Sequence, residues 1–359
     1  MSGVLRIGMV GAGNISKQYL AFFDRVETVR LVAVADLNAE AASAVAAARQ
    51  GCRALSVDDL VADPEVDVVL NLTIPAAHAP VALQAIAHGK GVYGEKPLAA
   101  TLAEAEQVMS AASAAGVLVG CAPDTVLGTG IQTARKAIDD GLVGAPIAAS
   151  AVMVTAGHER WHPNPDFYYL PGGGPLLDMG PYYVTALVQL LGPVTSVVGA
   201  ASRSRDSRTI GSGARAGQVV PVEIDTHVSG VLTHASGVLS TITMSFDSTA
   251  SRASRIEVHG TGGSLVVPDP NRFDGDVELN TGGEWAPVGP SAGYVDAGRG
   301  VGLVDWAQSS GVGSRASGEV AFHVLDIMES LLASAGSGSR VAVTSSVERP
   351  SLVPLQDPR

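Results

Sequence analysis

The chain has 359 residues, and 46% of them are hydrophobic, which is enough apolar material for the cores of two ordinary domains. Aromatic residues make up 4% and charged residues 16%, a composition typical of helices packed on a sheet and not of a disordered chain. The net charge of -12 and the lack of a Lys/Arg cluster argue against a nucleic-acid partner.

The cysteine and targeting signals favour a reducing compartment. Cys52 and Cys121 lie far apart and form no Cys-x-x-Cys pair, so we expect two buried thiols. The first residues lead directly into an apolar strand without the pattern of a signal peptide. No apolar run is long enough to span a membrane. We therefore expect a cytoplasmic protein with no membrane partner.

The first 122 residues alternate strand-like apolar runs with helix-like segments. The expected strands are Val4–Val10, Leu31–Ala35, Asp67–Thr73, Gly91–Gly94 and Val117–Cys121, and the expected helices are one that ends near Phe23 and then Ala39–Arg49, His78–His88 and Leu102–Ala115. Continuous apolar runs are typical of strands buried on both faces. The alternation predicts an α/β domain over residues 1–123, with a doubly wound parallel sheet of the Rossmann type.

From residue 124 onward the pattern changes, and residues 124–359 are expected to form a second, α+β domain with a mostly antiparallel sheet. The expected elements are helices Val126–Asp140, Pro175–Leu191 and Glu319–Ser334, and strands Ala148–Thr155, Thr226–Thr233, Val238–Phe246 and Val341–Thr344. Segments 203–218 and 290–302 are rich in Gly, Ser and Arg, and we expect them to be mobile loops.

A glycine-rich turn follows the first strand and reads Gly11-Ala12-Gly13-Asn14-Ile15-Ser16. Gly11 permits a tight turn, and Gly13 lets a pyrophosphate approach the N-terminus of the next helix. Asp36 ends the second strand, 25 residues after Gly11, near the offset of about 20 residues expected for a carboxylate that binds the ribose diol. Together these features predict a dinucleotide site, and Asp36 favours NAD over NADP because a carboxylate repels a 2′-phosphate.

Two further loops leave the carboxyl ends of strands that we place beside this turn. Thr73, Pro75 and His78 follow one strand and are expected to face the cofactor, although His78 could instead cap its helix. Glu95-Lys96-Pro97 follows the next strand. An ammonium at Lys96 would lie beside the nicotinamide, where it can stabilise charge that develops on a substrate oxygen.

At this point the chain resembles the Gfo/Idh/MocA oxidoreductases, a family that includes glucose–fructose oxidoreductase and inositol dehydrogenase. The matching motifs occur in the family's order along nearly the whole chain, and they are Gly11–Ile15, Asp36, Glu95–Pro97 and Gly172–Gly180 (Gly-Gly-Gly-Pro-Leu-Leu-Asp-Met-Gly). The resemblance implies a Rossmann domain, a C-terminal domain with a large open sheet, and homodimers or homotetramers formed through that sheet. It also implies that Lys96 is catalytic.

The family's helix commonly reads Asp-x-Gly-x-His, and here it reads Asp178-Met179-Gly180-Pro181-Tyr182. Asp178 matches a catalytic position, while Tyr182 stands where the family has histidine. An imidazole titrates near neutrality and a phenol near pH 10, so this exchange bears on proton transfer. Asp178, Tyr182, Thr185 and Gln189 form one helical stripe, which we expect to face water or a pocket.

The loop before this helix is the densest polar and aromatic segment of the chain. His158, Trp161 and His162 lie in it and are candidates to bind a sugar ring, whose faces are apolar and whose rim carries hydroxyl groups. Packing within the loop or an oligomer contact is the alternative. His323 on the last helix could reach the substrate or serve as a structural histidine. No third ligand at metal spacing accompanies these histidines, so we expect no metal site.

The sequence therefore predicts an NAD-dependent dehydrogenase or reductase that moves a hydride between the nicotinamide and a secondary hydroxyl or carbonyl of a sugar, glycoside or cyclitol. Lys96 would polarise the reacting oxygen, Tyr182 or a loop histidine would move the proton, and Asp178 would orient the substrate or Lys96. Two alternatives stay open: a redox-neutral glycosidase that holds NAD tightly, and a non-catalytic regulatory protein that senses the cofactor.

Overall fold

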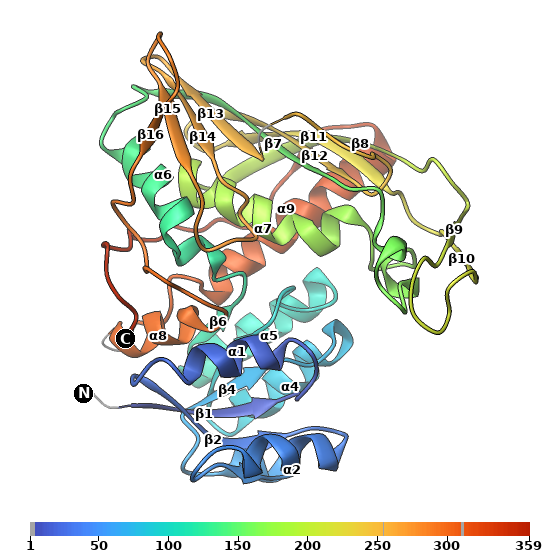
Figure 1. Ribbon diagram of the computed structural model, residues 1–359, viewed down its shortest axis with the longest axis vertical. Helices are drawn as coiled ribbons and strands as arrows, with labels where there is room; N and C mark the ends of the chain where they lie inside the picture. The colour runs from blue at the N-terminus through green and yellow to red at the C-terminus, as the bar shows by residue number, and fades with distance from the viewer. Residues whose placement is uncertain (1–3, 254, 310–311) are drawn as a thin grey trace. The chain divides into compact units, whose positions relative to one another are not determined.

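The computed structural model describes residues 4–253, 255–309 and 312–359, and the chain forms two compact units (Figure 1). Unit 1 comprises Met1–Thr129, Ala292–Leu325 and Pro350–Arg359, and unit 2 comprises Gly130–Ser291 and Asp326–Arg349. We expected a single boundary after residue 123, whereas the chain returns to unit 1 twice. Long-range contacts of this kind leave no local pattern in a sequence.

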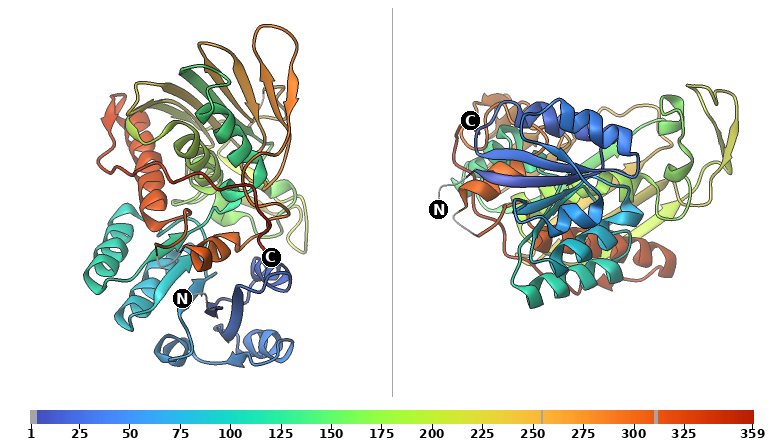
Figure 2. Two further views of the ribbon diagram at one scale, coloured as in Figure 1. Left: turned by 90° about the vertical axis from the view of Figure 1, so that its left-hand side faces the viewer. Right: turned by 90° about the horizontal axis from the view of Figure 1, so that it is seen from below.

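Unit 1 is built on a six-stranded parallel sheet with the strand order β3-β2-β1-β4-β5-β6. Its strands are β1 (Leu5–Val10), β2 (Val29–Ala35), β3 (Arg53–Ala54), β4 (Val68–Asn71), β5 (Gly91–Gly94) and β6 (Val119–Cys121). Its helices include α1 (Ser16–Phe23), α2 (Ala39–Ala47), α3 (Val57–Ala62), α4 (Pro75–Ala87), α5 (Leu102–Ala115) and α8 (Val301–Gln308). Figure 2 shows helices on both faces of this sheet, so the predicted doubly wound domain is confirmed.

One buried carboxylate explains why a distant segment joins unit 1. Asp124 follows β6, and its Oδ2 accepts hydrogen bonds from the amides of Gly300 at 2.8 Å and Gly302 at 3.1 Å. These amides lie at the start of α8, where a carboxylate is favoured by the unpaired N–H groups. Burial raises the pKa of Asp124, and the charge of Arg299 opposes that shift.

Unit 2 is built on a nine-stranded, mostly antiparallel sheet with the order β16-β15-β14-β13-β7-β12-β11-β8-β17. Only β7 and β12 pair in parallel within this sheet, in the residues that the structure describes. The strands are β7 (Pro146–Val154), β8 (Val194–Ser202), β11 (His227–His234), β12 (Leu239–Ser245), β13 (Ile256–Gly260), β14 (Ser264–Val267), β15 (Val277–Asn280), β16 (Ala286–Val288) and β17 (Val341–Ala342). The predicted open antiparallel sheet is confirmed.

Helices cover one face of this sheet. The helices are α6 (Thr129–Asp139), α7 (Pro175–Leu191) and α9 (Gly318–Ser337), the last of which begins in unit 1. Leu331 of α9 packs directly against Gly199 of β8 and Gly230 of β11, where any side chain would collide with it. No helix among the described residues has the length and apolar character that a membrane crossing requires.

Segment 203–218, expected to be a mobile loop, is not irregular throughout. It contains β9 (Ser207–Thr209), which pairs antiparallel with β10 (Val219–Pro221) to form a two-stranded hairpin. The composition is that of a loop because most of the hairpin is exposed and needs no apolar pattern. Segment 290–302 was also misjudged, since Tyr294 forms backbone bridges to Gly128 and Gln356 and α8 begins at Val301.

Candidate active site

The turn between β1 and α1 has the shape of a phosphate site. Gly11 has a φ of 100°, and a Cβ there would lie 2.7 Å from the carbonyl oxygen of Leu72. A Cβ at Gly13 would meet nothing within 4 Å, so open space adjoins the helix start. Ile15, at the N-cap, makes no side-chain hydrogen bond to the first turn, within the described residues. The amides of Ser16 and Gln18 donate to the carbonyls of Gly13 and Ile15, so the opening that an anion could use is the space beside Gly13.

Asp36 closes the same turn from the end of β2. Its Oδ2 accepts a hydrogen bond from the amide of Ala12 at 2.7 Å, and its Oδ1 accepts one from the amide of Asn38 at 2.7 Å. The carboxylate is therefore fixed beside the glycine turn, as a group that binds a ribose diol must be.

His78 joins the two loops that follow β4 and β5. Its Nδ1 lies 2.6 Å from the carbonyl oxygen of Pro97, and its Nε2 lies 3.1 Å from that of Thr73. Asn71 extends this network, because its side chain donates to the carbonyl of His78 and accepts from the hydroxyl of Thr73 at 2.6 Å. His78 is buried, so its side chain links the two loops, whereas Pro75 is exposed at the first turn of α4.

The Glu95-Lys96-Pro97 segment is held by a buried contact that the sequence analysis missed. The hydroxyl of Tyr19, on α1, donates to Glu95 Oε1 at 2.9 Å, and Glu95 Oε2 accepts from the amide of Lys96 at 3.1 Å. Burial and the nearby Glu95 charge raise the pKa of Tyr19 well above its ordinary value, so the hydroxyl stays a donor. Tyr19 lies on the buried side of an amphipathic helix and gave no signal beyond that of a core residue.

In unit 2 the structure pairs two of the predicted residues. Asp178 lies in the first turn of α7, and its Oδ2 is 3.1 Å from Nε2 of His158. An ionised carboxylate only accepts hydrogen bonds, so the contact with an ionised Asp178 requires the hydrogen on Nε2 of His158. The side chain of Asp178 is 20% exposed and that of His158 is 10% exposed. The pair therefore lies close to the surface, and little solvent reaches the imidazole.

Aromatic rings surround the imidazole of His158. Its centroid lies 4.4 Å from that of Phe246, 4.7 Å from Tyr168 and 5.1 Å from Trp161. Among the described residues Nδ1 of His158 is buried without a hydrogen-bond partner. Trp161 is 58% exposed, and the ring of His162 packs edge-on against it. The loop thus presents an indole to solvent directly beside the His158–Asp178 pair.

The polar stripe of α7 does not face solvent along its length. Tyr182, Thr185 and Gln189 are all buried, and Gln189 Oε1 accepts a hydrogen bond at 3.0 Å from Nη1 of Arg135 on α6. These three residues are therefore not solvated, and at Gln189 the polar contact comes from α6. A polar stripe can be satisfied by a neighbouring helix as well as by water.

His323 lies in unit 1 and is completely buried. It belongs to the part of α9 that precedes Leu325. The described residues contain no group of His, Cys, Asp and Glu side chains arranged to hold a metal ion.

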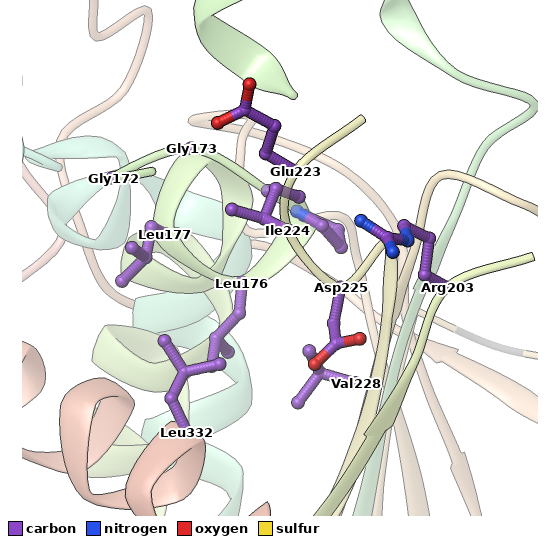
Figure 3. Close-up of a pocket in the computed structure, with 12 residues that line it drawn as sticks. Gly172, Gly173, Leu176, Leu177, Arg203, Glu223, Ile224, Asp225, Val228 and Leu332 are labelled. Carbon is purple, nitrogen blue, oxygen red and sulfur yellow. The ribbon is translucent and has the colours of Figure 1, made fainter. Parts of the chain in front are cut away.

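A cavity of about 400 Å³ opens at the start of α7 (Figure 3). Apolar side chains such as Leu176, Ile224 and Val228 line it together with the charged groups of Arg203 and Asp225. None of the predicted catalytic or substrate residues contributes to its lining.

Comparison with known proteins identifies the family. A model described as "Oxidoreductase family, NAD-binding Rossmann fold" matches residues 5–122, and a "GFO/IDH/MocA C-terminal domain" model matches residues 131–266. The chain belongs to the Gfo/Idh/MocA family of oxidoreductases. The predicted resemblance is confirmed, and so is the NAD-binding nature of the first domain.

Several Gfo/Idh/MocA relatives act on sugars or cyclitols. The chain is 31% identical over 266 residues to the 1,5-anhydro-D-fructose reductase of Ensifer adhaerens, and the aligned region covers 73% of this chain and 75% of that protein. It is 29% identical over 280 residues to the inositol 2-dehydrogenase of Rhizobium meliloti (strain 1021), and this aligned region covers 77% of the chain and 79% of that protein. A solved levoglucosan dehydrogenase in complex with NADH has the same fold, with a TM-score of 0.78, 20% identity, and coverage of 95% and 99%.

Proposed function

We propose that this oxidoreductase moves a hydride between NAD and a secondary hydroxyl or carbonyl of a sugar, glycoside or cyclitol. The choice of NAD is supported by the fixed Asp36 carboxylate, and the substrate class by the relatives that act on an anhydrosugar, inositol and levoglucosan. When bound, the nicotinamide supplies the carbon that takes up or releases the hydride. The binding groups would be Gly11, Gly13, Asn14, Ile15, Asp36 and the loops bearing Thr73 and Glu95.

The contact between His158 Nε2 and Asp178 Oδ2 is the main structural support for a substrate site at Asp178. It fixes a carboxylate acceptor beside an exposed indole, and this combination suits a hydroxyl on an apolar sugar ring. We assign Asp178 the task of orienting the reacting hydroxyl. Trp161 and His162 would contact the ring, while Lys96 would stabilise negative charge on the reacting oxygen.

The proton of the reacting hydroxyl has two candidate carriers, Tyr182 and His158. Nδ1 of His158 is buried, so His158 would act through Nε2 and its contact with Asp178. Tyr182 occupies the position that the family fills with histidine, and its hydroxyl can donate in the direction of reduction. Single variants at these two positions separate the two routes.

NADH production across a panel of sugars, anhydrosugars, glycosides and inositols, with NAD and NADP in parallel, tests the function. Lys96→Ala should lower kcat by about 10²–10³-fold while NAD binding is unchanged. Of His158→Gln and Tyr182→Phe, the one that removes the proton carrier should cost about 10²–10⁴-fold. Lys136→Ala, in an exposed pair with Asp140, is the matched control.

Wild-type turnover that Lys96→Ala leaves intact would overturn the mechanism. Cofactor binding without turnover of any polyol would favour the regulatory alternative. Glycoside cleavage by enzyme that is purified with NAD attached, and without net NADH, would favour the redox-neutral glycosidase.

We also propose that the chain forms a homodimer or homotetramer through the nine-stranded sheet. The face opposite α7 and α9 carries apolar side chains on adjacent strands. Val198 and Val231 are cross-strand partners, exposed by 40% and 38%, and Leu239 on the next strand is 48% exposed. Such clustering on one sheet face is typical of an association surface.

A further inference from the structure

An arginine of the β9–β10 hairpin is buried although the hairpin itself lies at the surface. The side chain of Arg208 is 1% exposed, whereas its neighbours Ser207 and Thr209 are exposed. Removing a guanidinium from water is costly unless it is fully paired. The contacts of Arg208 therefore show what the hairpin is anchored to.

Arg208 bridges two carboxylates from separate segments. Its Nη1 lies 3.3 Å from Glu159 Oε1, and its Nη2 donates to Oδ1 of Asp247. The hydroxyl of Thr226 donates to the other oxygen of Asp247 at 2.7 Å. Burial acts to raise the pKa of Asp247, but hydrogen bonds from Thr226 and Ser204 and the charge of Arg208 lower it overall. Both Nη groups of the guanidinium are thus used, while its Nε is buried without a hydrogen-bond partner among the described residues.

Tyr169 adds a third contact to this cluster. The guanidinium of Arg208 lies over its ring, 5.4 Å from the centroid, and its hydroxyl donates to Oε2 of Glu159. The same hydroxyl accepts a hydrogen bond from the backbone amide of His158 at 3.1 Å. The cluster therefore reaches the main chain of the residue that binds Asp178.

The two carboxylates that Arg208 bridges are the chain neighbours of two rings in contact. Glu159 follows His158, Asp247 follows Phe246, and the His158 and Phe246 rings lie 4.4 Å apart. Holding Glu159 and Asp247 at a fixed separation consequently fixes the imidazole against Phe246. From that position Nε2 of His158 reaches Asp178.

We propose that Arg208 is a positioning residue that sets His158, and through it Asp178, in the geometry required for catalysis. The inference rests on the proposed function, because it assumes that Asp178 orients the substrate. Arg208 itself touches no substrate, and its effect passes through Glu159, Tyr169 and Asp247. The β9–β10 hairpin is then a brace for the catalytic pair.

Variants at the bridge test this role. Arg208→Lys keeps the charge but loses the fork, and Arg208→Met loses both, so kcat for the polyol should fall by about 10²-fold in Arg208→Met and less in Arg208→Lys. NAD binding, which uses unit 1, should not change. Arg272→Met is the control, because Arg272 lies in unit 2 outside the hairpin and the aromatic loop and forms an exposed pair with Asp274.

Arg208→Met leaves Glu159 and Asp247 without their cation, and an unpaired buried carboxylate is strongly destabilising. A second variant therefore distinguishes loss of positioning from loss of the fold. The triple variant Arg208→Met/Glu159→Gln/Asp247→Asn removes all three charges and leaves none unpaired. It should fold with an unchanged far-UV circular dichroism spectrum and still show the fall in kcat. Wild-type kcat in the folded triple variant would overturn the inference.

The ring nitrogens of His158 provide a readout that does not depend on turnover. In ¹⁵N spectra of histidine-labelled protein, assigned with His158→Gln, the wild type should show a single tautomer with the proton on Nε2. Arg208→Met should show a mixture of tautomers, and Arg272→Met should match the wild type. If the wild type turns over no polyol but this change occurs, the proposed function fails and the positioning role stands. If the wild type turns over a polyol and Arg208→Met matches it in both kcat and the His158 tautomer, the positioning role is wrong.

Discussion

Asp36 does two things with one carboxylate. Its oxygens accept hydrogen bonds from the amides of Ala12 and Asn38, which keeps the glycine turn closed, and we propose that its negative charge lies beside the adenosine ribose of the dinucleotide. The first task needs only hydrogen-bond acceptors, whereas discrimination against a 2′-phosphate needs the charge. An amide at this position removes the charge and keeps one of the two acceptor oxygens.

We predict that Asp36→Asn raises the ratio of kcat/KM with NADP to that with NAD by about tenfold or more, since about 1.4 kcal/mol corresponds to a factor of ten. Asn keeps one acceptor oxygen and removes the repulsion, so the fold should be retained. Steady-state rates with both cofactors measure the ratio. Asp24→Asn, at an exposed aspartate paired with Arg49, is the control, and an unchanged ratio in Asp36→Asn would show that other residues select the cofactor.

We expect His234 to make the stability of unit 2 depend on pH. Burial lowers its pKa, although the hydrogen bond from Nδ1 to the carbonyl of Gly192, 2.8 Å long, acts in the opposite direction. The folded state then binds a proton less readily than the unfolded state. The contribution of His234 is therefore complete above the unfolded pKa of about 6.5 and is lost as pH falls below it.

We expect the urea concentration at the unfolding midpoint to decrease when the pH is lowered from 7.5 to 5.5, two conditions that bracket the value of about 6.5. His234→Asn should weaken this decrease. Carboxylates with lowered pKa values, such as Asp247 and Asp326, titrate below this window and do not mimic the effect. The variant should also lose about 1–3 kcal/mol at pH 7.5, because Ser240 loses its partner. Equal slopes in variant and wild type would exclude His234 as the cause.

At the scale of elements, the β1–α1 turn contains two glycines that serve different purposes. Gly11 is needed by the fold, since its φ of 100° and the nearby carbonyl of Leu72 exclude a side chain. Gly13 has open space where its Cβ would lie, so the fold alone does not require glycine there. The requirement at Gly13 comes from the pyrophosphate that we place in that space.

We predict opposite outcomes for two alanine variants of this turn. Gly11→Ala should destabilise unit 1 by about 1–3 kcal/mol because of strain. Gly13→Ala should leave the thermal midpoint unchanged and weaken NAD binding by at least about tenfold. Differential scanning fluorimetry and calorimetric titration with NAD measure the two effects. Equal NAD affinity in Gly13→Ala and wild type would argue that the pyrophosphate lies elsewhere.

Elements with long apolar runs were predictable from the sequence, and short or exposed ones were not. The strands of the parallel sheet and helix α7 were anticipated, since continuous burial leaves a continuous apolar pattern. Strand β3 has two exposed residues and no pattern to detect. The β9–β10 hairpin is stabilised by Arg208, whose partners are 49 and 39 residues away. Pairing over such distances is set by tertiary structure, which is also why the His158–Asp178 contact was open until the fold was known.

At the scale of the whole molecule, the residues that we propose for the chemistry are divided between the two units. Unit 1 carries the glycine turn, Asp36 and Lys96, and unit 2 carries Asp178, Tyr182 and the aromatic loop. The segments 292–325 and 350–359 return to unit 1, so neither unit is made from one continuous stretch of chain. Truncation at residue 123 would therefore remove part of the core of unit 1, including the cap that Asp124 provides to α8.

The last prediction concerns assembly through the nine-stranded sheet. If the face bearing Val198, Val231 and Leu239 is buried between two copies, Val231→Lys places an ammonium in an apolar interface and should convert the oligomer to a monomer. Multi-angle light scattering after size-exclusion chromatography measures the mass. Val219→Lys, at a 64% exposed valine of the β9–β10 hairpin, should keep the wild-type mass. An oligomer that survives Val231→Lys must use another surface, whereas a wild-type monomer would mean that this face is open to solvent.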